Sequence, residues 1–183
     1  MLFLSAALAT LAAFATTGAI TINRAPVRIV RDGHTLLTAT DRRVRALASD
    51  VQALVARGMA KSSTFSRLMV DIDNTDVIAY VEFNDRLPMG TAGRLVWAVS
   101  PPQGPRYLRI QISPDGTPNQ QVAVLAHELQ HALEVAVAPD VRDVQSFARL
   151  YDRIGTGNTV SRCYDTDAAQ LIGRRVMLEI QGS

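Results

Sequence analysis

Two of the three histidines of the chain stand four positions apart in the stretch VLAHELQHAL, residues 124–133, with a glutamate directly after the first. A helix advances about 100° per residue, so His127 and His131 would lie on one side, one turn apart, and both imidazoles could meet one metal ion. Imidazole is a good ligand for zinc, and a carboxylate beside an open coordination position can take a proton from a metal-bound water. The spacing therefore predicts a zinc site in which Glu128 is the general base.

The same stretch would form an amphipathic helix, which leaves a second interpretation open. Apolar side chains fill one arc: Val122, Leu125, Ala126, Leu129, Leu133 and Ala136. Polar side chains fill the opposite arc: His127, Glu128, Gln130, His131 and Glu134. A solvated helix face would also carry polar residues, but such faces normally mix both signs of charge. No lysine or arginine occurs between Arg109 and Arg142, which favours an arc that faces a cleft and receives a cation from outside.

The residues around the motif resemble those of the zincin metallopeptidases. The longer zincin pattern has valine or threonine three positions before the first histidine, uncharged variable positions and a hydrophobic residue at its end. Val124 and Leu133 meet the outer requirements, and the positions between them are uncharged apart from the motif. The resemblance implies a peptide or protein substrate, Zn²⁺ as cofactor, and a strand meander before the motif helix whose edge strand can pair with substrate. Glu128 would deprotonate the zinc-bound water as it attacks the peptide carbonyl and then pass the proton to the leaving amine.

A catalytic zinc site normally has three protein ligands, so one ligand has to come from elsewhere. The metzincin continuation H-x-x-G-x-x-H is absent, because Glu134 and Val137 occupy its glycine and third-histidine positions. The gluzincin-like families instead take an acid from a later helix, often within E-x-x-A-D. The run Asp165-Thr166-Asp167-Ala168-Ala169 resembles that pattern, with aspartate for glutamate at the start and alanine for aspartate at the end.

Helical spacing separates the candidate acids. Asp165 is four positions before Ala169 on the inward stripe of a helix expected over about 165–180, whereas Asp167 would project nearly opposite. We therefore expect Asp165 to be the third metal ligand, with a helix N-cap as the open alternative. Glu134 lies about 10 Å along the axis from His127, so we expect it to orient an imidazole or a nearby arginine. Tyr151 and Tyr164 are possible oxyanion donors, although each fits a core or loop aromatic better.

Three strands are expected ahead of the motif helix, over 77–83, 94–100 and 106–113, where apolar and β-branched residues are concentrated. Turn residues separate them, so the simplest arrangement is an antiparallel meander. A short strand is expected over 26–30. Residues 62–75 fit either a helix or a strand.

Four helices are expected around these strands. The first would begin at a Thr40 cap and end near Gly58. The motif helix would begin with a capping box over 117–120 and end before Pro139. The last two would run over about 141–154 and 165–180, with Gly155 as the stop of the former.

Composition limits the possible functions. The 183 residues are 48% hydrophobic, which is enough for one sizeable core, so we expect a single domain over 23–183. The formal charge of +2 comes from scattered arginines rather than a basic stripe, which excludes nucleic acid as a partner. Cys163 is the single cysteine, so no internal disulfide can form.

Residues 1–22 are uncharged in their side chains and rich in alanine and leucine. This composition predicts a signal peptide, with Ala13-Phe14-Ala15 as a small-x-small cleavage site, or else a retained membrane anchor. Both interpretations export the rest of the chain to the periplasm or the extracellular space, and the membrane would be contacted only through this segment.

The sequence as a whole predicts an exported, single-domain α+β protein of zincin-like fold, with about three strands and four helices. The expected activity is that of a zinc-dependent metallopeptidase in which His127, His131 and Asp165 bind metal and Glu128 is catalytic. The alternative is a non-catalytic exported module whose helix binds metal for structure or only packs.

Overall fold

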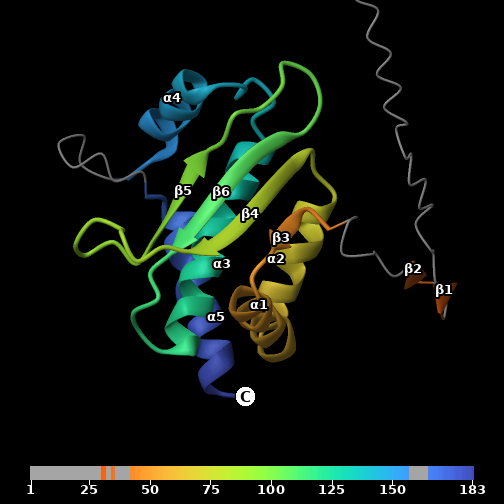
Figure 1. Cartoon of the computed structure of the whole chain (residues 1–183), viewed down its shortest axis with the longest axis vertical. Coiled ribbons are helices and arrows are strands. Elements are labelled where there is room, and N and C mark those ends of the chain that lie inside the picture. Colours follow the sequence, from red (N-terminus) through yellow and green to blue (C-terminus); the bar gives the residue numbers. More distant parts are fainter. Residues whose placement is uncertain (1–29, 32–33, 36–41, 157–164) are drawn as a thin grey trace, which may run out of the picture. The chain divides into compact units, whose positions relative to one another are not determined.

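The computed structural model describes residues 30–31, 34–35, 42–156 and 165–183 (Figure 1). The chain divides into two units, Met1–Thr38 and Ala39–Ser183. In the first unit, β1 (Val30–Arg31) pairs antiparallel with β2 (His34–Thr35). Of the strand expected over 26–30, only Val30 lies in the described residues, and it belongs to β1. The expectations for segment 1–22, Thr40, Cys163 and Tyr164 lie outside the described residues.

The second unit is α+β, and the part of it that the structure describes contains five helices and a four-stranded mixed sheet. The strands are β3 (Val44–Ala46), β4 (Val77–Phe83), β5 (Gly93–Trp97) and β6 (Arg106–Ile112). The helices are α1 (Ser49–Lys61), α2 (Ser63–Asp73), α3 (Pro118–Ala136), α4 (Val144–Ile154) and α5 (Asp167–Gln181). No described helix has the length and apolar character that a membrane crossing requires.

The expected antiparallel meander is wrong. The strand order is β3-β4-β6-β5, with β4 parallel to both β3 and β6, and only β5 antiparallel to its neighbour. The two seven-residue strands β4 and β6 pair along their whole length, and Val77, Ala79 and Val81 share the core face with Leu108, Ile110 and Ile112. The segment between them is long enough for the crossover that a parallel pair needs, and β5 is left at the sheet edge.

The first predicted helix is also corrected. Val44 belongs to β3, where it pairs with Ala79, and α1 begins only at Ser49. Gly58 does not end that helix, because α1 continues to Lys61. Its role is close packing: a Cβ at Gly58 would lie 2.8 Å from the ring of Phe65 on α2. The segment 62–75, which fitted either a helix or a strand, forms helix α2 over residues 63–73, with four buried apolar side chains at helical spacing.

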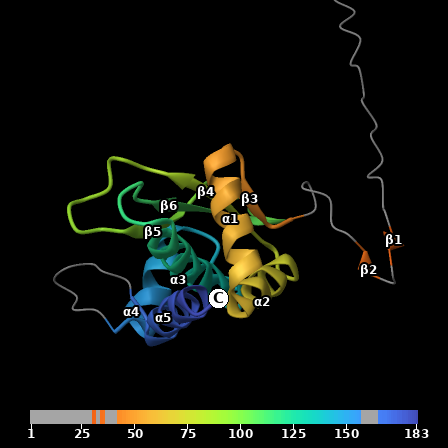
Figure 2. The same ribbon diagram turned by 90° about the horizontal axis from the view of Figure 1, so that it is seen from below.

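Helix α3 begins as predicted, with a capping box between Thr117 and Gln120 and proline in the first turn. It packs between the sheet and α5, and Figure 2 shows α3, α4 and α5 on one side of the strands. Its C-terminal end is held by the buried guanidinium of Arg106 on β6, which is 1% exposed. That guanidinium donates to the carbonyls of Val135, Ala136 and Ala138 and pairs with Asp76.

Candidate metal centre

The polar arc of α3 faces a cleft rather than bulk water. His131 is 3% exposed and Glu128 is 5% exposed, so the interpretation of this arc as a solvated helix face is wrong. Both residues, with His127, line a cleft of about 1250 Å³ whose other walls come from β5, α4 and α5. Burial of these polar groups is tolerated because each has a hydrogen-bonding partner, and the described residues include no buried side-chain nitrogen or oxygen without one.

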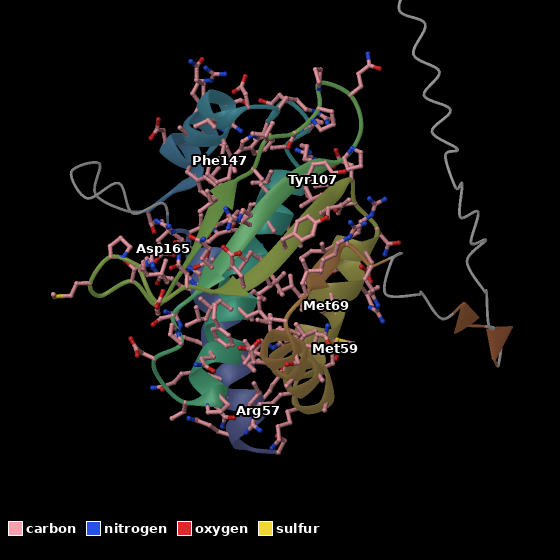
Figure 3. The ribbon with its side chains drawn as sticks, viewed as in Figure 1. Arg57, Met59, Met69, Tyr107, Phe147 and Asp165 are labelled. Carbon is pink, nitrogen blue, oxygen red and sulfur yellow. The ribbon has the colours of Figure 1, made fainter. Side chains whose placement is uncertain are left out.

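His127, His131 and Asp165 meet at one point in the cleft. The Nε2 atoms of the two histidines are 3.1 Å apart, and Nε2 of His127 is 3.4 Å from Oδ1 of Asp165. One ligand atom from each residue lies within 4.8 Å of the other two. Within the described ranges, these three residues form a group that could hold a metal ion. Figure 3 labels Asp165 on the side of the molecule where α5 begins.

Asp165 reaches this point because it lies just outside α5. The N-cap of α5 is Thr166, whose hydroxyl accepts the N–H of Ala169, so the N-cap alternative for Asp165 is wrong. The Asp165 carboxylate instead accepts hydrogen bonds from the backbone N–H of Thr166 at 2.8 Å and from the side chain of Gln170 at 2.9 Å. Asp167, in the first turn of α5, is exposed and takes no part in the group.

Both imidazoles are held by contacts with neighbouring residues. Nδ1 of His131 lies 2.8 Å from Oε2 of Glu134, which therefore contacts the second histidine and does not join the group. The backbone of Ala169 on α5 also interacts with the His127 ring and raises its pKa, while Nε2 of His127 faces His131. A neutral imidazole that donates from Nδ1 keeps a lone pair at Nε2. The two rings direct their Nε2 atoms at the same point.

Close approach of α5 to α3 depends on Gly173. A Cβ at this position would lie 3.3 Å from the carbonyl oxygen of Ala123 and 3.4 Å from Cβ of His127. The contact with Ala123 is tighter than most side chains make and the contact with His127 is at the limit, so glycine allows the two helices to cross closely at the first histidine. The sequence pattern alone does not distinguish this glycine from a helix-weakening one.

Glu128 sits between the metal-binding group and the edge strand β5. Burial raises its pKa to about 7; the nearby Asp165 also raises it, while His131 and a backbone hydrogen bond with Leu95 lower it. Gly93 lets the strand come close, since a Cβ there would lie 2.5 Å from Val124 and 3.0 Å from Oε1 of Glu128. Burial and the neighbouring His131 likewise lower the pKa of His127, against the opposing effects of Asp165 and Glu134.

The free edge of β5 borders the cleft. Ala92 and Ala98 make backbone hydrogen bonds with β6, and in an antiparallel pair such residues alternate with residues whose backbone groups point away from the partner strand. Gly93, Leu95 and Trp97 therefore direct their N–H and C=O groups outward. Leu95 contacts Glu128 in this way, while Gly93 lines the cleft.

Tyr151 belongs to the core. It is 3% exposed, and its hydroxyl donates to the carbonyl oxygen of His131 at 2.9 Å. Burial raises the pKa of its phenol well above the usual value. The ring packs edge-on against both His131 and Phe147, so it supports the histidine from behind.

The sequence did not single out Thr166 and Gln170, which hold Asp165. A threonine before an apolar helical stripe is a recognisable N-cap signal, so Thr166 could have been found. No family model, curated protein or solved structure matches this chain.

Proposed function

We propose that this protein is a zinc-dependent metallopeptidase that hydrolyses peptide bonds in the cleft between α3 and β5. The observation that carries the proposal is the convergence of two imidazole nitrogens and the Asp165 carboxylate beside the buried carboxyl group of Glu128. Three protein ligands with one open position are typical of catalytic zinc, whereas structural zinc sites are usually closed by four.

Two of the three donor separations fit zinc, while all three donor atoms lie within 4.8 Å of one another. Two nitrogens bound to one tetrahedral zinc at about 2.0–2.1 Å stand about 3.3 Å apart. The separations of 3.1 Å between the histidine nitrogens and 3.4 Å between His127 and Asp165 are close to that value. Two acceptor nitrogens and a carboxylate that face one another also repel unless a cation lies between them. The hydrogen bond that Nδ1 of His131 donates to Glu134 is the kind of outer contact that metal-binding histidines usually have.

A bound zinc ion supplies Lewis acidity, polarising the peptide carbonyl and activating water. In this proposal Glu128 takes the proton of the attacking water and delivers it to the leaving amine. Its pKa of about 7 suits both transfers at neutral pH, and the contact with Leu95 keeps its carboxyl group at the cleft. An extended peptide could pair with the outward backbone groups of Gly93 and Trp97, and β5 would then hold the scissile bond in line with Glu128.

Two measurements on the purified full chain test this proposal. Elemental analysis should find one zinc per chain. Incubation with a mixed peptide library, followed by mass spectrometry, should reveal new termini with wild type and none with Glu128→Gln, which should keep its zinc. Glu82→Gln is the matched control, because Glu82 pairs with Arg109 away from the cleft and its loss should leave cleavage intact.

The outcomes separate the candidate functions. A clean protein without zinc would refute the metal site, and cleavage that survives in Glu128→Gln would refute the mechanism. Stoichiometric zinc without any cleavage would instead support the non-catalytic metal-binding module. We also propose that the protein is exported, on the basis of the apolar segment 1–22, and fractionation of cells that express the full chain tests this.

A further inference from the structure

Thr166 contacts both Asp165 and Glu134, the partner of His131, and so connects the two sides of the metal-binding group. Its hydroxyl accepts the N–H of Ala169 at 3.1 Å and so caps α5. The same hydroxyl donates to Oε1 of Glu134 at 2.6 Å, across to α3. A hydroxyl has one proton and two lone pairs, so both bonds can exist at once. Thr166 is 4% exposed, and water therefore competes little for either bond.

The second oxygen of Glu134 continues the connection to the metal-binding group. Oε2 of Glu134 lies 2.8 Å from Nδ1 of His131 and accepts its proton. That bond selects the tautomer in which Nε2 of His131 is free to bind a metal. A carboxylate fixed at one oxygen by Thr166 holds its other oxygen, and hence the imidazole, in a narrower range of orientations.

The opposite side of the group depends on the same residue. Asp165 directly precedes Thr166, and its Oδ1 accepts the Thr166 backbone N–H at 2.8 Å. The Thr166 hydroxyl caps α5 and bonds to Glu134 on α3. It therefore fixes the start of α5, and with it the preceding Asp165, relative to His127.

We propose that Thr166 is a positioning residue that aligns His131 through Glu134 and Asp165 through the start of α5. This inference rests on the proposed metal site. The prediction is that loss of the hydroxyl lowers zinc affinity by about 10- to 100-fold, the usual effect of removing an outer contact of a metal-binding histidine.

The test uses Thr166→Val, which keeps the shape and removes the hydroxyl, and Thr166→Ser, which restores it. Zinc affinity of the full chain is measured by competition with a chelator, and thermal unfolding of the metal-free protein is measured in parallel. Thr117→Val is the matched control, since it removes the N-cap hydroxyl of α3 far from the histidines. We expect weaker binding only in Thr166→Val, rescue in Thr166→Ser, and lower stability with unchanged affinity in Thr117→Val.

Glu134→Gln is a second variant of nearly unchanged shape, useful if Thr166→Val folds poorly. Its amide can donate to Nδ1 of His131 and should favour the wrong tautomer, with a similar loss of affinity. If Thr166 acts on His131 through Glu134, the double variant should bind only slightly more weakly than Glu134→Gln alone. Full additivity would refute the route through Glu134, and equal affinities in the Val and Ser variants at position 166 would overturn the proposal as a whole.

Nitrogen NMR of the metal-free protein separates this inference from the proposed function. The His131 ring should carry its proton on Nδ1 in wild type and in Thr166→Ser, and should show mixed tautomers in Thr166→Val. A tautomer change in a protein that binds no zinc would refute the metallopeptidase while supporting the role of Thr166. An unchanged tautomer together with unchanged zinc affinity would refute the role of Thr166 alone.

Discussion

Oδ1 of Asp165 lies 3.4 Å from Nε2 of His127, although the two residues are far apart in the sequence. Asp165 precedes α5, and His127 faces it from α3. The pairing holds an anionic oxygen beside an imidazole nitrogen that also faces His131, which is an arrangement suited to a shared cation.

Asp165→Asn should lower zinc affinity by at least about 100-fold, because loss of a direct ligand costs more than loss of an outer contact. The matched control is Asp167→Asn, two positions further on, where the carboxylate is exposed in the first turn of α5. That change should cost about 0.3–1 kcal/mol of stability through the helix dipole and leave affinity unchanged. Chelator competition measures both variants, and equal affinities would rule out Asp165 as a ligand.

Gly173→Val should force α5 away from α3. Its Cβ would meet the Ala123 carbonyl at 3.3 Å, and a backbone oxygen cannot rotate away. We expect a loss of about 1–3 kcal/mol in the free energy of unfolding and weaker zinc binding. Leu171→Val on the exposed side of the same helix controls for the β-branched side chain. Urea unfolding measures the stability of the two variants, and chelator competition measures their zinc affinity. Equal effects of the two substitutions would show that α5 does not need glycine at position 173 to approach α3.

Gly93→Ala should disturb Glu128 through Val124. The new methyl group would lie 2.5 Å from a Val124 methyl group and 3.0 Å from Oε1 of Glu128. We expect a loss of about 1–3 kcal/mol of stability and, if the protein is a peptidase, reduced cleavage with zinc retained. Adding Val124→Ala removes the tighter contact and should recover part of the stability. Thermal unfolding of the single and double variants shows whether the two positions are coupled, and additive losses would refute the contact.

Arg106→Met should be among the most destabilising single changes on the sheet. It would leave the Asp76 carboxylate and several carbonyls at the end of α3 without their buried donor, at a cost of about 3–5 kcal/mol. Arg109→Met, on the same strand, removes an ion pair in which Arg109 is 50% exposed, and should cost at most about 1 kcal/mol. Urea denaturation compares the two, and similar midpoints would show that Arg106 does not hold α3.

Glu179 makes the stability dependent on acid. Burial would raise the pKa of its carboxyl group, but hydrogen bonds from Ser62 and Thr64, with Arg175 nearby, lower it from 4.5 to about 2. A lowered pKa means that the stabilisation is complete above pH 4.5 and is lost as the pH falls toward 2. After allowance for solvent screening, we expect Glu179→Gln to cost about 1–2 kcal/mol at pH 7 and little at pH 2. Urea unfolding at both pH values tests this, and a difference that does not depend on pH would refute it.

Local features of the sequence predicted α3 well. The capping box of Thr117 and Gln120, the proline in the first turn and the four-residue histidine spacing depend on neighbours within one or two turns. The absence of cations across that stretch correctly indicated a polar arc facing a cleft. The N-cap of α5 is equally local, because the Thr166 hydroxyl accepts the N–H of Ala169 three residues further on.

Strand pairing was not readable in the same way. The alternating residues of β6 identified a strand, but the choice of neighbour depends on how β4 and β6 share one buried face across a long connection. Val44 was misplaced in a helix for the same reason, since its extended conformation comes from pairing with Ala79. When the spacing of apolar residues in a short segment fits either a helix or a strand, pairing with a distant strand decides between them.

The sequence by itself determined that His127, Glu128 and His131 share one side of one helix, because helical geometry places residues four apart together. Only the tertiary structure decided that Asp165 joins them and that β5 buries Glu128. Both depend on where separate elements cross. Thr166 caps the start of α5 and leaves Asp165 just outside the helix, and Gly173 and Gly93 allow α5 and β5 to come close to α3 where a side chain would crowd its neighbours. Such contacts come from the packing of the whole domain, and no local pattern encodes them.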